Sequence, residues 1–316
     1  MDDNKILVSI QCLVYNHEPY LRQCLDGFVM QKTNFCFEAI VHDDVSTDGS
    51  AAIIREYAEK YPDIIKPIYE TENQYSKRDG SLFKIMNAAC KGKYIAMCEG
   101  DDYWIDPLKL QKQVDILESD DSVSMVYTSF KTVDSKGNLM LRPDYENYKK
   151  RSFTGDVFYK LITSGNFIMT LTTCFRKEIY ENDVMKGYPF MLDYTLFLGV
   201  SSMGKAVFLP EETGCYRYVE NSAMNSNIRS IQNNYLHVKK HFVCALINGK
   251  IIKVQGYSLL RKVQMYSLLM KQALVLYKKK IDKEFITILL KKKVLIAIIP
   301  ISLFLIMKDK IINHIS

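Results

Sequence analysis

Three carboxylates occupy four consecutive positions in the segment KYIAMCEGDDYW, residues 93–104. Glu99, Asp101 and Asp102 follow a short apolar run, and carboxylates held this close repel one another unless they share protons or bind a cation. Oxygen ligands favour a hard ion such as Mg²⁺ or Mn²⁺, which keeps open positions for the phosphates of a substrate. The other interpretation is a solvated acidic turn in which Asp102 or Asp106 caps the next helix.

A second acidic cluster lies in VHDDVSTDGS, residues 41–50. Asp44 comes directly after a strand-like run, where it could accept hydrogen bonds from a nucleotide base or a ribose. Ser46, Thr47 and Asp48 are candidates to cap the following helix. The loop has neither the Walker A nor the G-x-G-x-x-G spacing, so we do not expect its glycines to bind phosphate.

The elements that position these clusters alternate between two hydrophobic periods. Strand-like runs at 6–14, 37–43, 64–70 and 93–98 alternate with helical patterns at 18–31, 51–62, 81–90 and 106–118. This alternation favours an α/β fold with a parallel sheet covered on both faces. Ligands of such sheets bind beyond the carboxyl ends of the strands. Both acidic clusters follow strands, so we expect them to form one site.

The next hundred residues are less regular. Strand-like runs at 122–134, 205–210 and 213–219 flank a helical pattern at 192–204 that has Asp193 near its start. A carboxylate there is favoured by the helix dipole without any catalytic role. Eight cysteines without C-x-x-C spacing indicate neither a zinc site nor a disulfide framework. The N-terminal residues are too acidic and too briefly apolar for a signal peptide, which favours a cytosolic protein.

The chain changes in charge near residues 221–230. From Ser226 onward it has 17 Lys and Arg against 3 Asp and Glu, whereas the first 225 residues have 25 against 33. The tail combines an amphipathic pattern at 257–280 with an apolar run that is shorter than a membrane span and is interrupted by Pro300. We expect domains at 1–225 and 226–316, and a helical basic and apolar tail lying on an anionic membrane surface. The alternative is that the tail packs on the first domain or on a second copy, and its Leu and Ile content argues against nucleic acid.

Three segments, in this order, resemble the family 2 inverting glycosyltransferases of bacterial surface-polysaccharide type, which have the GT-A fold. They are VSIQCLVYNHEPYLRQCLDG, FEAIVHDDVSTDGS and GKYIAMCEGDDYWIDPLKLQKQVDILE, and the resemblance continues more weakly through residues 192–217. The resemblance implies a mostly parallel central sheet, with a nucleotide-binding half at 1–105 and an acceptor half at 106–225. It also implies Mn²⁺ or Mg²⁺ as cofactor.

The resemblance implies several roles on the nucleotide side. Tyr15 and Asn16 stand at the end of the first strand, where the family surrounds the base, and Glu18 lies in the same loop. Asp44 resembles the aspartate that binds uracil in this family, and Asp43 is its neighbour.

The motif Glu99-Gly100-Asp101 stands where the family has D-x-D. Asp101 is the expected direct metal ligand, and Gly100 allows the turn. Glu99 replaces the usual Asp, and its longer side chain leaves open whether it contacts ribose, metal or neither.

Asp193, in LDYTL, resembles the general base, which takes the proton of an acceptor hydroxyl as it attacks the anomeric carbon. Arg217 resembles a residue near the diphosphate, although Val219 stands where the family often has His. Asp102 and Trp104 are expected beside the acceptor sugar. The alternative for Trp104 is a buried structural residue.

The resemblance implies an enzyme that moves a hexosyl or N-acetylhexosaminyl group from a nucleotide-diphosphate sugar, specifically a UDP-sugar, to a lipid-linked or polysaccharide acceptor. The enzyme would lie at the cytoplasmic face of the cell membrane, and a homodimer is compatible with its tail. A nucleotidyltransferase with a related sheet is a second hypothesis, but residues 16–27 lack the glycine-rich basic loop that it would have. An inactive membrane-bound adaptor is a third, and it would not need both Asp101 and Asp193.

Overall fold

The computed structural model describes residues 5–186 and 193–219, together with residues 238, 241–242, 258 and 261. The chain divides into two compact units, Met1–Val157 with Asn166–Asn227, and Phe158–Gly165 with Ile228–Ser316. Nearly all of the predicted membrane-associating tail lies outside the described residues, so its predicted role stays a prediction. Within the described part of the chain, no helix is long and apolar enough to cross a membrane.

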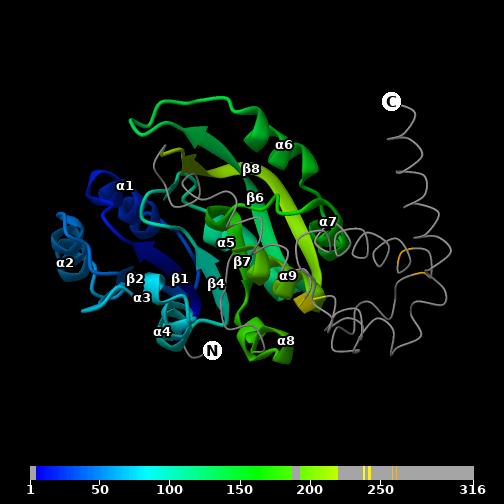
Figure 1. The fold of residues 1–316 in the computed structure, drawn as a ribbon, viewed down its shortest axis with the longest axis horizontal. Coiled ribbons are helices and arrows are strands. Elements are labelled where there is room, and N and C mark those ends of the chain that lie inside the picture. The colour runs from blue at the N-terminus through cyan, green and yellow to red at the C-terminus, as the bar shows by residue number, and fades with distance from the viewer. Residues whose placement is uncertain are drawn as a thin grey trace, which may run out of the picture. The chain divides into compact units, whose positions relative to one another are not determined.

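An eight-stranded sheet in the order β3-β2-β1-β4-β7-β6-β8-β5 forms the centre of the first unit (Figure 1). Its strands are β1 (Ile6–Val14), β2 (Cys36–Asp43), β3 (Ile65–Tyr69), β4 (Tyr94–Met97), β5 (Tyr103–Trp104), β6 (Val123–Val133), β7 (Thr173–Arg176) and β8 (Lys205–Arg217). The pairs β2–β3, β1–β2, β1–β4 and β6–β8 are parallel, whereas β4–β7, β6–β7 and β5–β8 are antiparallel. The predicted α/β fold with a mostly parallel sheet is therefore confirmed.

The predicted helical patterns correspond to α1 (Glu18–Val29), α2 (Ser50–Lys60), α4 (Ser81–Ala89), α5 (Lys109–Ser119) and α9 (Asp193–Met203). The helices α3 (Gln74–Lys77), α6 (Pro143–Arg151) and α8 (Asp183–Lys186) were not predicted. The helix predicted to start at Asp106 begins at Lys109 instead. The Asp106 carboxylate accepts from the Leu108 amide at 2.8 Å, so it closes a turn just before the helix.

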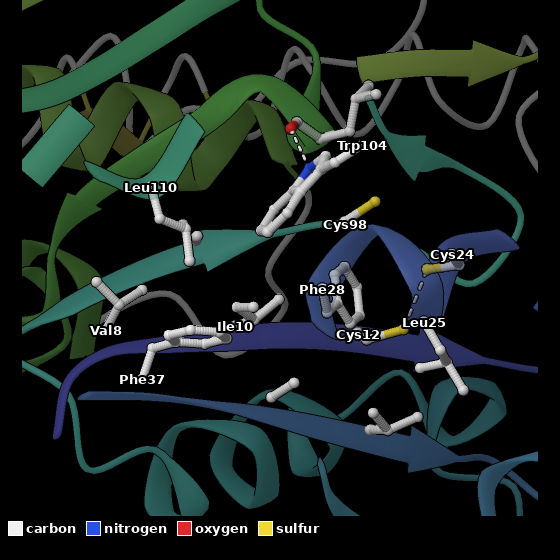
Figure 2. Close-up of a cluster of buried hydrophobic side chains, with 14 of the residues drawn as sticks. Val8, Ile10, Cys12, Cys24, Leu25, Phe28, Phe37, Cys98, Trp104 and Leu110 are labelled. Carbon is white, nitrogen blue, oxygen red and sulfur yellow. Dashed lines mark hydrogen bonds between the residues drawn. The ribbon is translucent and has the colours of Figure 1, made fainter. Parts of the chain in front are cut away.

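The main hydrophobic core lies between the sheet and helices α1, α2 and α5 (Figure 2). Leu25 and Phe28 of α1 and Leu110 of α5 are fully buried there, against strand residues such as Ile10. Burying an aliphatic or aromatic side chain of this size stabilises the fold by about 1.5 to 3 kcal/mol. These contacts hold the strand ends in place, and the loops that follow the strands therefore start from fixed positions.

The cysteines behave mainly as small core residues. Six of the seven cysteines that the structure describes are buried, and no disulfide joins any of the seven. Cys12 and Cys24 lie with their sulfur atoms 4.0 Å apart (Figure 2), and the Cys24 thiol donates to the Glu99 carbonyl at 3.4 Å.

Two features of the sheet differ from the sequence prediction. The runs 205–210 and 213–219, expected as two strands, form the single strand β8, whose pairing with β6 shifts register between Thr128 and Phe130. A bulge adds a residue to a strand without ending it. The break in the apolar pattern near residues 211–212 therefore lies inside one strand and is not a turn between two strands. The short strands β5 and β7 were not predicted, because they form by pairing with strands far away in the sequence, β5 with β8 and β7 with β4 and β6.

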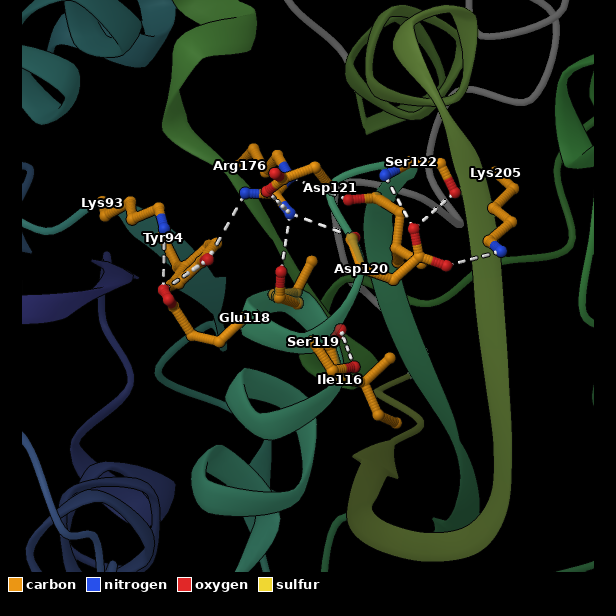
Figure 3. Close-up of polar contacts among 12 residues, drawn as sticks. Lys93, Tyr94, Ile116, Glu118, Ser119, Asp120, Asp121, Ser122, Arg176 and Lys205 are labelled. Atoms are coloured by element: carbon orange, nitrogen blue, oxygen red, sulfur yellow. Dashed lines mark hydrogen bonds and ion pairs between the residues drawn. The ribbon is translucent and has the colours of Figure 1, made fainter.

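Arg176 at the end of β7 joins three elements (Figure 3). Its guanidinium donates to the carbonyls of Leu117 at 2.6 Å and Val123 at 2.8 Å, which belong to α5 and β6. It is 8% exposed. Because β7 is inserted antiparallel between β4 and β6, this network ties the part of the sheet formed by β1 to β4 to the part formed by β6 and β8.

The second unit contains most of helix α7 (Val157–Ser164). Phe158 lies edge-on to Phe242, with 6.4 Å between ring centroids. The guanidinium carbon of Arg261 lies 4.7 Å from the ring centroid of Tyr159. These ring contacts connect α7 to residues from the last third of the chain.

Candidate active site

Three loops meet at the carboxyl edge of the parallel strands. The end of β1 pairs with the end of β2, where Val14 lies opposite Asp43 and its carbonyl accepts from the Asp44 amide at 2.9 Å. On the other side of β1, the Gly100 amide donates to the Leu13 carbonyl at 3.0 Å. The two acidic clusters therefore lie on either side of the loop that follows β1, at the edge where α/β sheets bind ligands.

The loops after β1 and β2 are fastened to each other. Asn16 has a left-handed backbone (φ 56°), and its side-chain carbonyl accepts from the Thr47 amide at 2.7 Å. Glu18 accepts from the Gly49 amide at 2.8 Å, while Asp48 accepts from the Glu18 amide at 3.0 Å. These bonds use Asn16 and Glu18 to hold the loop, and their predicted contacts with a nucleotide stay predictions.

The carboxylate of Asp44, which was expected to bind the base, is hydrogen-bonded to the protein's own main chain. Both of its carboxylate oxygens accept main-chain N–H groups, from Gln74 at 2.6 Å and Tyr75 at 3.0 Å, and its side chain is buried. Asp43 is also buried, and one of its oxygens accepts from the Ser46 amide at a long 3.3 Å. Tyr15, beside them, is 50% exposed, so its ring is accessible to a base.

The turn after β4 concentrates negative charge. Glu99 and Asp101 are partly exposed, and the Asp102 amide closes the turn by donating to the Glu99 carbonyl at 3.0 Å. Removal from water, then the charges of Asp193 and Asp101, raises the pKa of Glu99 well above its usual range. The charge of Asp193, which comes from a distant part of the chain, therefore acts on Glu99.

Asp193 begins α9 and is also partly buried. Burial raises its pKa to about 6. A carboxylate with this pKa is ionised at neutral pH but is more basic than an exposed aspartate. The structure thus brings the predicted base to the predicted metal-binding turn, from nearly a hundred residues away in sequence.

Gly100 is required by the packing of this turn. A Cβ atom at this position would lie 2.7 Å from His17 Nδ1 and 3.0 Å from a methyl carbon of Val14. The first contact is shorter than real Cβ atoms make and the second is tighter than most, so a larger residue here would displace the His17 and Val14 side chains.

Arg217 at the end of β8 holds the acidic turn from behind. Its amide donates to Asp102 Oδ1 at 2.7 Å, and its Nε donates to the Asp101 carbonyl at 2.9 Å. Other guanidinium nitrogens donate to the Asp134 carbonyl at 3.2 Å and to the Gln23 side chain at 2.7 Å. These bonds make Arg217 a support of the turn, and its predicted contact with a diphosphate stays a prediction.

The two residues expected beside an acceptor sugar face the interior. Asp102 is 1% exposed, and Trp104 is 2% exposed with its indole N–H donating to the Leu171 carbonyl at 2.9 Å. Phe28 packs edge-on against the Trp104 ring (Figure 2), and the Lys109 amine lies over that ring, 4.3 Å from its centroid. Of the two interpretations of Trp104, the structure therefore has the buried one, and the predicted acceptor contact of Asp102 stays a prediction.

The acidic turn suits a cation, although it does not enclose one. Within the described residues, no group of three or more His, Cys, Asp and Glu side chains is arranged to hold a metal ion. Removal from water raises the pKa of Glu99 most, and the neighbouring charges of Asp193 and Asp101 raise it further; a bound cation would relieve the repulsion among these charges. Glu99 and Asp101 offer only oxygen donors, which fit Mg²⁺ or Mn²⁺.

Sequence reasoning missed Tyr75. This residue lies in the short helix α3, is 50% exposed, and has its amide on Asp44. Burial, followed by the charges of Asp193 and Glu99, raises its pKa. Four residues of helix give no usable periodicity, so only the three-dimensional contact with Asp44 connects Tyr75 to the site.

A doubly covered α/β sheet with carboxylates at its carboxyl edge is the architecture of nucleotide-sugar transferases with the GT-A fold. The sequence profile named Glycosyl transferase family 2 matches residues 9–182. This match covers more than half of the chain, so the chain belongs to glycosyltransferase family 2 and is a glycosyltransferase. The family resemblance seen in the three motifs is thereby confirmed.

Relatives by sequence include proteins with and without a described activity. An uncharacterised protein of Mycobacterium tuberculosis is 31% identical over 250 residues, which are 79% of this chain and 69% of that protein. A chondroitin synthase of Escherichia coli is 25% identical over 240 residues, which are 75% of this chain and 32% of that protein.

Two solved structures resemble the fold. Staphylococcus aureus TarS 1-349, in complex with UDP-GlcNAc, superposes with a TM-score of 0.60 at 16% identity, covering 84% of this chain and 72% of TarS 1-349. The mannosyltransferase PcManGT of Pyrobaculum calidifontis, with GDP-Man and Mn²⁺, gives 0.53 at 17% identity and covers 95% and 88%. At these identities the likeness supports the GT-A fold and nothing finer.

Proposed function

We propose that this glycosyltransferase moves a sugar from a UDP-sugar to an acceptor hydroxyl with inversion at the anomeric carbon. Asp193 acts as the general base. The observation that carries the proposal is the convergence of Asp193 with Glu99 and Asp101 at the carboxyl edge of the sheet.

The base role of Asp193 follows from its surroundings. Its carboxylate begins a helix, is partly buried, and has a pKa raised to about 6. It can therefore stay ionised at neutral pH and still accept the proton that an attacking hydroxyl releases. Inversion requires only this one base, since the hydroxyl attacks the face of the sugar opposite the leaving diphosphate.

Glu99 and Asp101 would hold Mn²⁺ or Mg²⁺ on the diphosphate side. When bound, the ion would supply positive charge to stabilise the leaving diphosphate. Arg217, Asp102 and Gly100 keep the turn against β1 and β8, so the two carboxylates are presented from a rigid support. The structural relative with Mn²⁺ and a nucleotide sugar supports this choice of cofactor.

The donor and acceptor are proposed by class. A relative in structure was solved with UDP-GlcNAc, which supports a UDP-sugar, and Tyr15 offers an accessible ring beside Asp43 for the base. Relatives in sequence include chondroitin and hyaluronan synthases, which supports a glycan or a lipid-linked glycan as acceptor. The basic tail would keep the enzyme at the cytoplasmic membrane surface, where such acceptors are assembled.

The test measures the release of UDP from a panel of UDP-sugars, with and without Mn²⁺. Asp193→Asn should lower the rate by a factor of about 100 or more, because the amide accepts no proton. Asp101→Asn should lower the rate and also weaken the dependence on Mn²⁺. Asp115→Asn, on the exposed side of α5, is the matched control and should behave as wild type.

Two results would contradict the proposal. Full activity in both Asp193→Asn and Asp101→Asn would contradict the roles proposed for these two carboxylates in catalysis. Formation of UTP and a sugar 1-phosphate from UDP-sugar and added pyrophosphate, with no release of UDP, would instead identify a nucleotidyltransferase.

A further inference from the structure

The two most exposed large apolar side chains in the described part of the chain lie in one loop. Leu139 is 71% exposed and Leu141 is 88% exposed, and both belong to the segment between β6 and α6. We call residues 134–142 the leucine loop. In Figure 1 it extends past the tip of β6 before the chain turns back to α6. Isolated apolar side chains are common on protein surfaces, whereas neighbouring ones indicate a contact surface.

Hydrogen bonds and a ring contact hold the loop on both sides of the leucines. The Asp134 carboxylate closes the turn before them, where it accepts from the amides of Lys136 at 2.8 Å and Asn138 at 2.9 Å. After them, the guanidinium carbon of Arg142 lies 3.9 Å from the centroid of the Tyr218 ring. The chain that carries the leucines is therefore fixed at both ends, and it presents these side chains to the outside.

The leucine loop leaves the sheet at the edge that carries the acidic turn. Because β7 is antiparallel to both β4 and β6, the strand β6 ends at the same edge as β4. Arg217 joins the loop to the turn: its Nε donates to the Asp101 carbonyl at 2.9 Å, and a terminal nitrogen donates to the Asp134 carbonyl at 3.2 Å. The start of the leucine loop therefore lies directly beside the acidic turn.

The charge around the leucines is mainly positive. Residues 131–151 contain six Lys and Arg against three Asp and Glu. Each of the three acids is hydrogen-bonded or ion-paired within this segment, and they are Asp134, Asp144 and Glu146. The lysines of the segment that form no ion pair with a described residue are Lys131, Lys136 and Lys150. The unpaired charge of the segment is therefore positive.

Exposed leucines among unpaired lysines fit one kind of partner, the surface of a membrane that contains anionic lipid. Leucine side chains insert at the boundary between headgroups and acyl chains, and lysines near that surface are attracted to anionic headgroups. A contact between two copies of the loop would instead bring the same lysines together, and like charges across an interface oppose association.

We infer that the leucine loop inserts Leu139 and Leu141 into an anionic membrane surface and turns the carboxyl edge of the sheet toward the lipid. The inference rests on the proposed function, because it takes the membrane-bound acceptor from it. The acidic turn then faces the surface at which a lipid-linked acceptor presents its sugar. The loop acts together with the basic tail, since two leucines bury less apolar surface than one fatty-acyl chain, which by itself binds only marginally.

A tryptophan in the loop reports this contact. Trp104 is the only tryptophan of the chain and is 2% exposed, so Leu141→Trp adds one accessible reporter. The probe is a vesicle of phosphatidylglycerol and phosphatidylcholine with brominated acyl chains, which quench tryptophan that enters the lipid, and the protein is the full-length chain. Tyr69→Trp is the matched control, because Tyr69 is 39% exposed and ends β3, the outermost strand on the other side of the sheet.

The expected result is quenching confined to the loop. Emission from Leu141→Trp should be quenched and should shift to shorter wavelength, whereas Tyr69→Trp should show neither change. A double variant, Leu139→Ser with Leu141→Ser, should bind the same vesicles about ten-fold more weakly, because the apolar surface that inserts is lost. Its melting temperature and its affinity for UDP should equal those of wild type, since both leucines lie outside the core.

Two results would overturn the inference alone. In the first, the full-length chain binds the vesicles but Leu141→Trp is quenched no more than Tyr69→Trp, so the loop faces away from the lipid. In the second, wild type is a dimer in solution and the double serine variant is a monomer, so the leucines contact a second copy.

Other results separate this inference from the proposed function. Wild type that binds no vesicle would refute both the loop contact and the membrane location. Failure to release UDP from any UDP-sugar, with Leu141→Trp still quenched, would refute the transfer reaction and leave the contact of the loop with lipid standing.

Discussion

Asp193 illustrates how one side chain sets the chemistry of a site. Near a helix start, an exposed aspartate would titrate near its usual value of about 3.9. Partial burial in this fold raises its pKa to about 6. The same carboxylate contributes to the raised pKa of Glu99 and of Tyr75, so its charge acts across the whole centre.

The raised pKa of Asp193 predicts an acidic limit to activity. A carboxyl group is protonated below its pKa, and a protonated base accepts no proton, so kcat should fall about ten-fold for each pH unit below 6. Initial rates of UDP release at saturating donor, from pH 4.5 to 8, would measure this. Calorimetry with UDP at each pH separates lost chemistry from lost donor binding. A kcat that stays level down to pH 5 would contradict the assignment of Asp193 as base.

At the scale of elements, the short strand β7 matters more than its length suggests. It lies between β4 and β6 and carries Arg176, which bonds carbonyls of α5 and β6 (Figure 3). The nearby Lys205–Asp120 ion pair, 2.7 Å long, spans β8 and the end of α5 at the surface. The Arg176 network is buried, whereas the Lys205–Asp120 pair is exposed to solvent.

This difference predicts unequal stabilities for two variants. Arg176→Met leaves the buried carbonyls of Leu117 and Val123 without a donor, so it should lower the free energy of unfolding by about 2 to 4 kcal/mol. Lys205→Met breaks only an exposed ion pair and should change stability little. Urea unfolding followed by circular dichroism measures both. Equal effects would show that the Arg176 network contributes nothing beyond a surface ion pair.

At the scale of the whole molecule, charge separates the chain into an acidic first part and a basic last part. The acidic part contains the site. The charge excess of residues 226–316 is a property of composition alone, and it supports association with anionic lipid.

The full-length protein should therefore bind anionic vesicles. We expect it to sediment with vesicles that contain phosphatidylglycerol but not with pure phosphatidylcholine, and to be released by salt as screening increases. A chain that ends at residue 225 is the comparison and should stay in the supernatant if it remains folded by circular dichroism. Sedimentation of full-length protein with neither vesicle would refute the membrane role of the tail.

Local patterns in the sequence determined the parallel strands β1 to β4, the helices between them and the acidic segments at their ends. These elements have strong periodicity, and the carboxyl ends of adjacent parallel strands must share an edge. The motif order then indicated the family. The bulged strand β8 and the short strands β5 and β7 depended on pairing between residues far apart, which no local pattern records.

Tertiary structure alone decided which of the candidate side chains are buried and which already hold hydrogen bonds within the protein. Composition cannot distinguish a buried Trp104 from an exposed one, nor an Asp44 that holds α3 from one that is free to bind a base. These outcomes depend on contacts such as Trp104 with Leu171 and Asp44 with Tyr75, which join residues 67 and 31 positions apart. Burial and neighbouring charge, which set pKa values and hydrogen-bonding capacity, arise only when the folded chain brings such residues together.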